Sequence, residues 1–290
     1  MIVLKKYFFV IGVLFFINNT KAQESSVYLK NITDSIRFSK IETNRFLYND
    51  TFKRVLNSEL IADNAFDYSW DSIKNTVSVL ESADKKLKVI TWVVLTDKQE
   101  YYNYGLVLYK KKSSSPFYFY WLSSKKLEKI DPLYEDLTAD LWQGALYYQI
   151  HDFKRKKQNY YCVVGFDGAD KNKNLKIIDV LWVDKSNELH IGAPVFYSNK
   201  NDFTPQYRVV FEYADQSVML LRFEKELNVI AFSNINPSNR EKLGNYSYYI
   251  PDGRIDFYLK NKKGKWIRHE DFEEWDKKNK RIKKEDETNN

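Results

Sequence analysis

The chain has 290 residues, of which 43% are hydrophobic and 29% are charged, and its formal net charge is +7. This balance is typical of a globular protein and excludes intrinsic disorder and a helical membrane protein as descriptions of the whole chain. Aromatic residues make up 17% of the chain, whereas Gly and Pro number only 9 and 6. Because Tyr and Phe favour half-buried pleated surfaces, we expect a mainly β fold.

The positive charge does not indicate a nucleic-acid partner. Three lysines lie within residues 1–22, and residues 261–290 contain ten basic and eight acidic side chains, so the segment between them is nearly neutral. A protein that binds nucleic acid concentrates basic charge on one element. We therefore expect no nucleic acid among the partners of this chain.

Residues 1–22 have the pattern of a signal peptide. Lys5 and Lys6 precede an apolar run over residues 7–17, and the segment ends on Ala22. About 20 apolar residues are needed to cross a bilayer, so this short run favours cleavage after Ala22 over an uncleaved anchor. No cysteine follows the run directly, which excludes a lipid-modified N-terminus. We expect a periplasmic or secreted protein with no transmembrane segment after cleavage.

Residues 23–73 are expected to form an N-terminal helical segment that packs on the sheet after it. Apolar side chains recur largely every three to five residues between Asn44 and Asp63. This spacing gives a helix one apolar face, which requires a partner surface.

Residues 74–268 are expected to form a β-rich domain. Short aromatic and β-branched runs alternate there with turn residues, such as Pro-Asp-Gly at 251–253. Connections this short join antiparallel neighbours, because parallel pairing requires crossovers of a dozen or more residues. We predict antiparallel meander sheets in a sandwich or barrel-like arrangement, with a small propeller as the less favoured alternative. Residues 269–290 are predicted to form a charged tail in which Phe272 and Trp275 are candidate docking residues, and we expect its end to be disordered or a frayed helix.

Four stretches of the chain carry a family resemblance. They are Val77–Trp92, Trp142–Tyr148, Tyr160–Gly168 and Tyr249–Phe257. In order and spacing they resemble a family of exported β-rich proteins that is common in Bacteroidota and has no assigned activity. The resemblance implies export and a β-rich fold, and it carries no catalytic residue over to this chain.

The loop that starts at Asp167 is the candidate metal site. Asp170, Asn172 and Asn174 alternate as the first ligands of a calcium loop do. The pattern then fails, because Leu175 replaces the required Gly and a Leu also stands where the bidentate Glu belongs. We keep two interpretations, a solvated hairpin turn and a weak Ca²⁺ site at Asp167 and Asp170, and expect no other cofactor.

Two further groups could carry chemistry. Asp131, Glu135 and Asp136 would share one side of a helix, and together with Asp140 and the 167–170 loop they could serve a glycan-directed hydrolase. A solvated surface helix explains these acids equally well.

Cys162, the only cysteine, could meet His151 across a hairpin and act as a nucleophile with its base. The simpler interpretation is that Cys162 is a small buried apolar residue. A single cysteine also excludes an intramolecular disulfide.

Aromatic side chains on the predicted strands are the remaining candidates for binding. Strand side chains alternate between faces, so about half of these rings would point outward unless both faces are covered. The candidate binding residues are Trp92, Tyr118, Tyr120, Trp121 and Tyr147. Our leading expectation is an exported, non-catalytic binding or structural protein of the cell envelope that contacts a protein or a polysaccharide through an aromatic sheet face. The alternative is the secreted hydrolase.

Overall fold

The computed structural model describes residues 26–61, 65–68, 70–112, 115–124 and 131–288. The predicted signal peptide at residues 1–22 lies outside this part of the chain. The chain divides into two compact units, Met1–Ser78 and Val79–Asn290. Among the described residues, no helix has both the length and the apolar character that crossing a membrane requires.

The first unit is helical, as its apolar spacing predicts. It contains a helix over residues 26–38, then α2 (Glu42–Leu60) and two short 3₁₀ turns, η1 (Ala65–Asp67) and η2 (Asp71–Ile73). The buried residues of α2 recur every three or four positions and so share one face of the helix: they are Arg45, Asn49, Phe52, Leu56 and Leu60. The predicted docking of this unit on a sheet stays a prediction.

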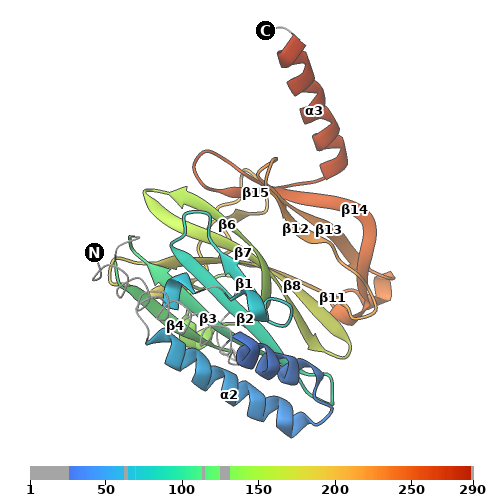
Figure 1. Cartoon of the computed structure of the whole chain (residues 1–290). Coiled ribbons are helices and arrows are strands. Elements are labelled where there is room, and N and C mark those ends of the chain that lie inside the picture. Colours follow the sequence, from blue (N-terminus) through green and yellow to red (C-terminus); the bar gives the residue numbers. More distant parts are fainter. Residues whose placement is uncertain (1–25, 62–64, 69, 113–114, 125–130, 289–290) are drawn as a thin grey trace, which may run out of the picture. The chain divides into compact units, whose positions relative to one another are not determined.

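The second unit contains three β-sheets (Figure 1). The first sheet has the order β1 (Ser78–Glu81), β2 (Leu87–Leu95), β3 (Tyr101–Lys110) and β4 (Phe117–Ser123). The central sheet has the order β5 (Leu137–Thr138), β9 (Leu189–Ile191), β8 (Lys173–Val183), β7 (Gln158–Asp170) and β6 (Leu146–Arg155), and β11 (Val209–Ala214) also pairs with β8. The third sheet has the order β10 (Phe196–Tyr197), β15 (Trp266–His269), β14 (Tyr249–Lys260), β13 (Val229–Pro237) and β12 (Leu221–Glu224).

The central sheet is buried on both faces. On β7, Tyr161 and Val163 pack between the first and central sheets, whereas Cys162 and Val164 pack between the central and third sheets. The strand period of two therefore supplies two cores from one continuous apolar run. The predicted mainly β fold of antiparallel sheets is confirmed, in the form of the sandwich.

One strand pair differs from the predicted antiparallel sheets, and the charged tail is helical, one of the two forms expected for it. β10 pairs with β15 in parallel, and because these strands are far apart in the chain, no short connection requires them to be antiparallel. The charged tail forms the helix α3 (Phe272–Thr288), which extends beyond β15 (Figure 1). Phe272 and Trp275 contact Phe257, with ring centroids 5.7 and 4.8 Å away, so the two candidate docking residues do dock.

The predicted acidic helix over residues 131–140 is wrong. This segment forms a turn, the short strand β5 and the 3₁₀ turn η3 (Ala139–Leu141). The backbone N–H of Leu133 donates to Asp131 Oδ1 at 3.0 Å, which favours a turn over a helix. The acids therefore do not line one helix face.

Candidate functional site

Three edge strands meet around one cavity in the second unit. β1 is an edge of the first sheet, β6 of the central sheet and β12 of the third sheet. The cavity has a volume of about 510 Å³. It is lined by Val79, Leu80, Glu81, Ala83, Tyr148, Gln149, Ile150, His151, Asp152, Phe223 and Lys225. An edge strand has backbone N–H and C=O groups without a ladder partner, so this cavity lies where pairing capacity is unused.

Hydrogen bonds between side chains of β6 and the backbone of its neighbours fix the spacing of the three edge strands. Asp152 accepts hydrogen bonds from the backbone N–H groups of Ala83 at 3.1 Å and Asp84 at 2.8 Å, next to β1. On the other side, Gln149 Oε1 accepts from the N–H of Phe223 on β12 at 2.8 Å. Tyr148 donates its hydroxyl to the carbonyl of Leu221 at 2.7 Å. The central sheet thus holds the other two edges at defined positions.

A β-bulge in β6 directs these side chains. The pairing with β7 shifts register between Tyr147 and Gln149. Because of the extra residue, the consecutive side chains of Tyr148 and Gln149 both reach the third sheet, whereas Tyr147 packs toward the first sheet. The bulge therefore places two polar side chains on the same wall of the cavity.

His151 is the titratable ring of the cavity. Its ring stacks on Phe223 with centroids 3.8 Å apart and meets Trp266 edge-on at 6.0 Å. Burial, together with the positive charges of Lys260 and Lys225, lowers the pKa of His151 to about 4. The ring is therefore neutral at pH 7, and its buried Nε2 has no hydrogen-bond partner among the described residues.

The lining of the cavity includes charged groups of both signs. Lys225 follows β12 and is exposed. Glu81 is on β1, where Lys88 Nζ lies 3.5 Å from its Oε1, and Asp152 is on β6, where burial raises the pKa of its carboxyl. A ligand in the cavity would therefore meet a positive charge next to β12 and carboxyl groups on β1 and β6.

The five predicted aromatic binding residues lie elsewhere, and two of them are core residues. Trp92 is 1% exposed and Tyr147 is 0% exposed, so neither offers surface to a partner. Tyr118 is 42% exposed, and Tyr120 and Trp121 are half-buried on the edge strand β4. Trp92 and Trp121 meet edge-on with ring centroids 6.3 Å apart, but the five side chains do not form one exposed surface.

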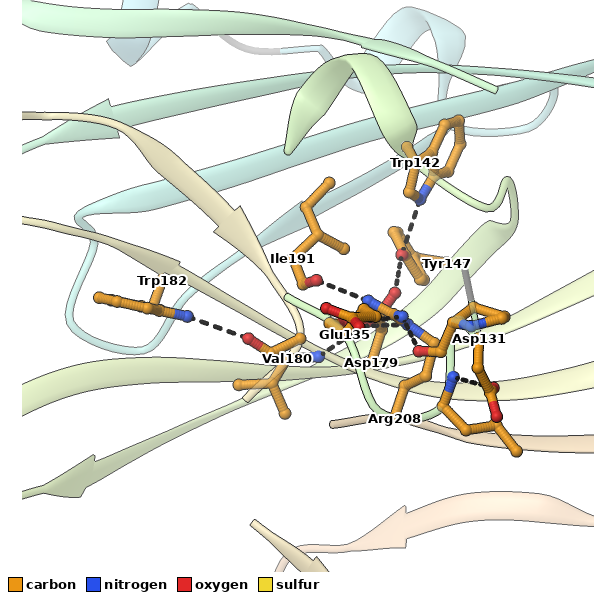
Figure 2. A network of polar contacts seen from close by, with 12 residues as sticks. Asp131, Glu135, Trp142, Tyr147, Asp179, Val180, Trp182, Ile191 and Arg208 are labelled. Atoms are coloured by element: carbon orange, nitrogen blue, oxygen red, sulfur yellow. Dashed lines mark hydrogen bonds and ion pairs between the residues drawn. The ribbon is translucent and has the colours of Figure 1, made fainter. Parts of the chain in front are cut away.

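Tyr147 belongs to a buried polar network (Figure 2). Trp142 Nε1 donates to the Tyr147 hydroxyl at 2.9 Å, and that hydroxyl donates to Asp179 Oδ2 at 3.0 Å. Arg208 Nε donates to Asp179 Oδ1 at 3.3 Å, and the exposed fractions of these two charged side chains are 0% and 1%.

Arg208 uses its remaining donors on backbone carbonyls. Its Nη1 donates to the carbonyls of Pro132 and Glu135, and its Nη2 donates to that of Ile191 at 2.5 Å (Figure 2). The side chain thereby joins the 131–136 turn to β9. Sequence reasoning missed this pair, because 29 residues separate its charges and no local motif marks them.

The predicted calcium residues accept hydrogen bonds from their own loop and from Asn103 on β3. Asp167 Oδ1 accepts from Asn103 Nδ2 at 2.9 Å and from the N–H of Ala169 at 3.2 Å. Asp170 Oδ1 accepts from the N–H groups of Asn172 and Lys173 at 2.8 and 3.2 Å. These bonds form a hairpin turn of the kind that Asp favours. A Ca²⁺ site there stays a prediction.

The predicted Cys162 and His151 pair has the required register but not the required chemistry. The two residues are directly opposite on β7 and β6, and so share one face. Cys162 is only 2% exposed, and burial raises the pKa of its thiol far above its usual value. A buried thiol that stays protonated is not a nucleophile, so the apolar interpretation of Cys162 holds.

Comparison of the chain with protein-family models, with curated proteins and with solved structures found no match. The resemblance to exported proteins of Bacteroidota stays a prediction.

The sequence gives little indication of the cavity. Which strands form sheet edges follows from the pairing of distant segments, not from local pattern. The one available signal is length, since β1 and β12 have only four residues each and short strands are frequent at edges.

Proposed function

We propose that this chain is a non-catalytic binding protein that holds an extended peptide segment of a partner protein along the free edge of β6. The observation that carries the proposal is the cavity lined by three sheet edges. Peptides that add a strand to an exposed edge gain affinity from main-chain hydrogen bonds and specificity from the pockets beside them.

The size of the cavity supports a short peptide. Its volume of about 510 Å³ is within the range of ligand sites in proteins. Five consecutive residues of β6, 148–152, line it. At about 3.3 Å per residue they span about 16 Å, which matches a peptide of about five extended residues.

The lining supports side-chain selection. Val79, Leu80, Ile150 and Phe223 offer apolar contacts on both sides of the β6 edge. Lys225 follows β12, whereas the carboxyl groups of the lining are on β1 and β6, which favours a peptide with an acidic residue near β12. The buried Nε2 of His151 has no partner among the described residues, and it can accept a hydrogen bond from the ligand or, in the other tautomer, donate one.

The proposal moves the binding surface from an aromatic sheet face to a sheet edge. Trp92 and Tyr147, two of the five candidate binding residues, are buried and pack in cores. A non-catalytic role fits the protonated thiol of Cys162 and the turn-forming hydrogen bond of Asp131. Export to the cell envelope, which the first 22 residues predict, would bring the protein to partners there.

A displayed peptide library selected on the purified protein tests the proposal. The dissociation constants of selected peptides are measured by fluorescence anisotropy for the natural chain, for Ala83→Trp, which fills the cavity, and for Lys171→Trp, which adds the same ring at an exposed hairpin tip. We expect Ala83→Trp to weaken binding at least tenfold, about 1.4 kcal/mol, and Lys171→Trp to leave it unchanged.

Hydrogen–deuterium exchange locates the peptide. Bound peptide should protect amides of residues 148–152 and leave β4 unprotected. Equal affinity of the two tryptophan variants, or protection confined to β4, would overturn the proposal. Binding of oligosaccharides that Ala83→Trp abolishes would reassign the cavity to a glycan.

A further inference from the structure

A second cluster of polar side chains lies at the hairpin between β8 and β9. Asp184, Glu188 and His190 each place a potential metal ligand atom within 4.8 Å of the others. The hairpin dictates this arrangement, since Asp184 Oδ1 accepts from the N–H of Glu188 at 2.8 Å. His190 is opposite Trp182 in the β8–β9 pairing, and the two rings stack with centroids 4.0 Å apart.

A carboxylate outside this trio orients the His190 ring. His190 Nδ1 lies 2.7 Å from Asp136 Oδ2. When Nδ1 donates its proton to Asp136, the lone pair of the neutral ring is on Nε2. Histidine ligands of metals have this arrangement, with one ring nitrogen on the metal and the other donating to a carboxylate.

The other ring nitrogen lies beside a carboxylate. His190 Nε2 lies 3.7 Å from Asp184 Oδ2, and this buried nitrogen has no hydrogen-bond partner among the described residues. With Nδ1 protonated, the Nε2 lone pair and the two carboxylates lie around one small volume. A cation in that volume would bind all three groups.

We propose that Asp184, Glu188 and His190 bind a divalent transition-metal ion, with Asp136 as the positioning residue for the His190 ring. One imidazole and two carboxylates suit Zn²⁺, whereas Ca²⁺ takes oxygen ligands alone. Three protein ligands leave a fourth position of a tetrahedral ion open to water or to a ligand.

Modest side-chain movement completes the site. In a tetrahedral site, two ligand atoms at about 2.1 Å from the ion are about 3.4 Å apart, so atoms that now lie within 4.8 Å of one another must approach by up to about 1.4 Å. Glu188 is exposed, and rotation of its long side chain can supply this movement. The hairpin backbone is already fixed by Tyr120, whose hydroxyl donates to the carbonyl of Asn187 at 2.6 Å.

Isothermal titration of the chelator-treated protein with Zn²⁺ tests this inference independently of peptide binding. We expect one ion per chain. His190→Gln and Glu188→Gln should each weaken Zn²⁺ binding at least tenfold, and Asp136→Asn by about 10–100-fold, the usual effect of removing a carboxylate behind a histidine ligand. Asp184→Asn is less suitable, because that carboxylate also caps the hairpin.

Matched controls separate the site from general surface binding. His269→Gln removes another histidine and Glu226→Gln another exposed acid, and both should leave Zn²⁺ binding unchanged. Co²⁺ substitution adds a spectroscopic readout, since its visible absorption should depend on His190.

Each remaining outcome would overturn the inference. Unchanged Zn²⁺ affinity in His190→Gln would show that the ion binds elsewhere. Absence of Zn²⁺ binding, with a lower melting temperature of His190→Gln, would show that the His190 and Asp136 pair only stabilises the fold. Tighter binding of Ca²⁺ than of Zn²⁺ would exclude the imidazole as a ligand.

Discussion

Two regions of the central sheet contain buried polar groups, and they differ in how those groups are satisfied. In the network around Arg208, both carboxylate oxygens of Asp179 accept hydrogen bonds, and Nε, Nη1 and Nη2 of Arg208 all donate. In the cavity at β6, the Nε2 of His151 has no partner in the described part of the chain. The charged groups of the network are paired within the protein, whereas the cavity offers both space and a ring nitrogen without a partner among the described residues.

Buried polar residues therefore affect stability in two different ways. A fully paired group stabilises one arrangement of the chain, and removing one partner is costly. An unpaired group beside a cavity destabilises the free protein, and a ligand that forms a hydrogen bond with it removes this free-energy penalty. The comparison predicts large stability effects in the network and pH-dependent effects in the cavity.

Replacing Arg208 with alanine should have the largest effect. Arg208→Ala leaves Asp179 buried without its counter-charge, and we expect the free energy of unfolding to fall by about 3–5 kcal/mol. Arg254→Ala is the matched control, because Arg254 is exposed and pairs with Asp252 at 2.7 Å. An exposed pair contributes at most about 1 kcal/mol. Urea unfolding measures both, and similar losses would refute the distinction.

Gly192, next to the network, should give the second largest effect. Its φ of +112° is unfavourable for other residues, and an added Cβ would lie 2.8 Å from Arg208 Nη2 and 3.1 Å from the carbonyl oxygen of Glu135. Gly253 also has a positive φ of +91°, but nothing lies within 4 Å of its Cβ position. A positive φ costs a residue other than glycine about 1–3 kcal/mol.

The difference between the two glycine variants isolates the contact with the network. We expect Gly192→Ala to destabilise the protein by at least about 1 kcal/mol more than Gly253→Ala does, as measured by urea unfolding. Equal losses would mean that Arg208 moves aside without cost, and the network would then be less rigid than its hydrogen bonds indicate.

The local sequence pattern predicted the strands and hairpins of this fold, but it did not predict which faces of the strands are buried. The β-rich segment predicted over residues 74–268 and the hairpin that pairs His151 with Cys162 agree with the structure. Alternation and turn residues determine such features within a few neighbours. The same alternation could not indicate that Trp92 is buried, because the cover on each face of a strand depends on distant segments.

The candidate sites were less predictable for the same reason. Asp136, His190 and Asp184 are brought together by pairing of β5, β9 and β8, so their spacing in the sequence shows no metal motif. The cavity at β6 requires the edges of three sheets. The Asp167 loop shows the reverse case. Its local sequence resembles a calcium loop, but its carboxylates accept hydrogen bonds from the backbone of the turn.

The smallest of the three effects should come from His151 and depend on pH. Burial lowers its folded-state pKa to about 4, against 6.5 for an unperturbed histidine. The unfolded chain therefore binds a proton between these values while the folded protein does not, so His151 makes the protein less stable as pH falls from about 6.5 to about 4. One pKa unit corresponds to about 1.4 kcal/mol, and partial exposure of the ring reduces the total to about 1–2 kcal/mol.

Urea unfolding of the natural chain and of His151→Gln from pH 7 to pH 4 measures this contribution as the difference between the two stability curves. The comparison removes the carboxyl groups, which also lose stability in acid and titrate in both proteins. His269→Gln is the control for effects that are specific to the cavity, because burial lowers the pKa of His269 as well but His269 does not line the cavity.

A peptide that donates a hydrogen bond to the neutral Nε2 of His151 should bind less tightly to the natural chain below pH 5. Parallel stability curves would mean that His151 is hydrated in solution, and its unpaired nitrogen would then no longer distinguish the cavity from the Arg208 network.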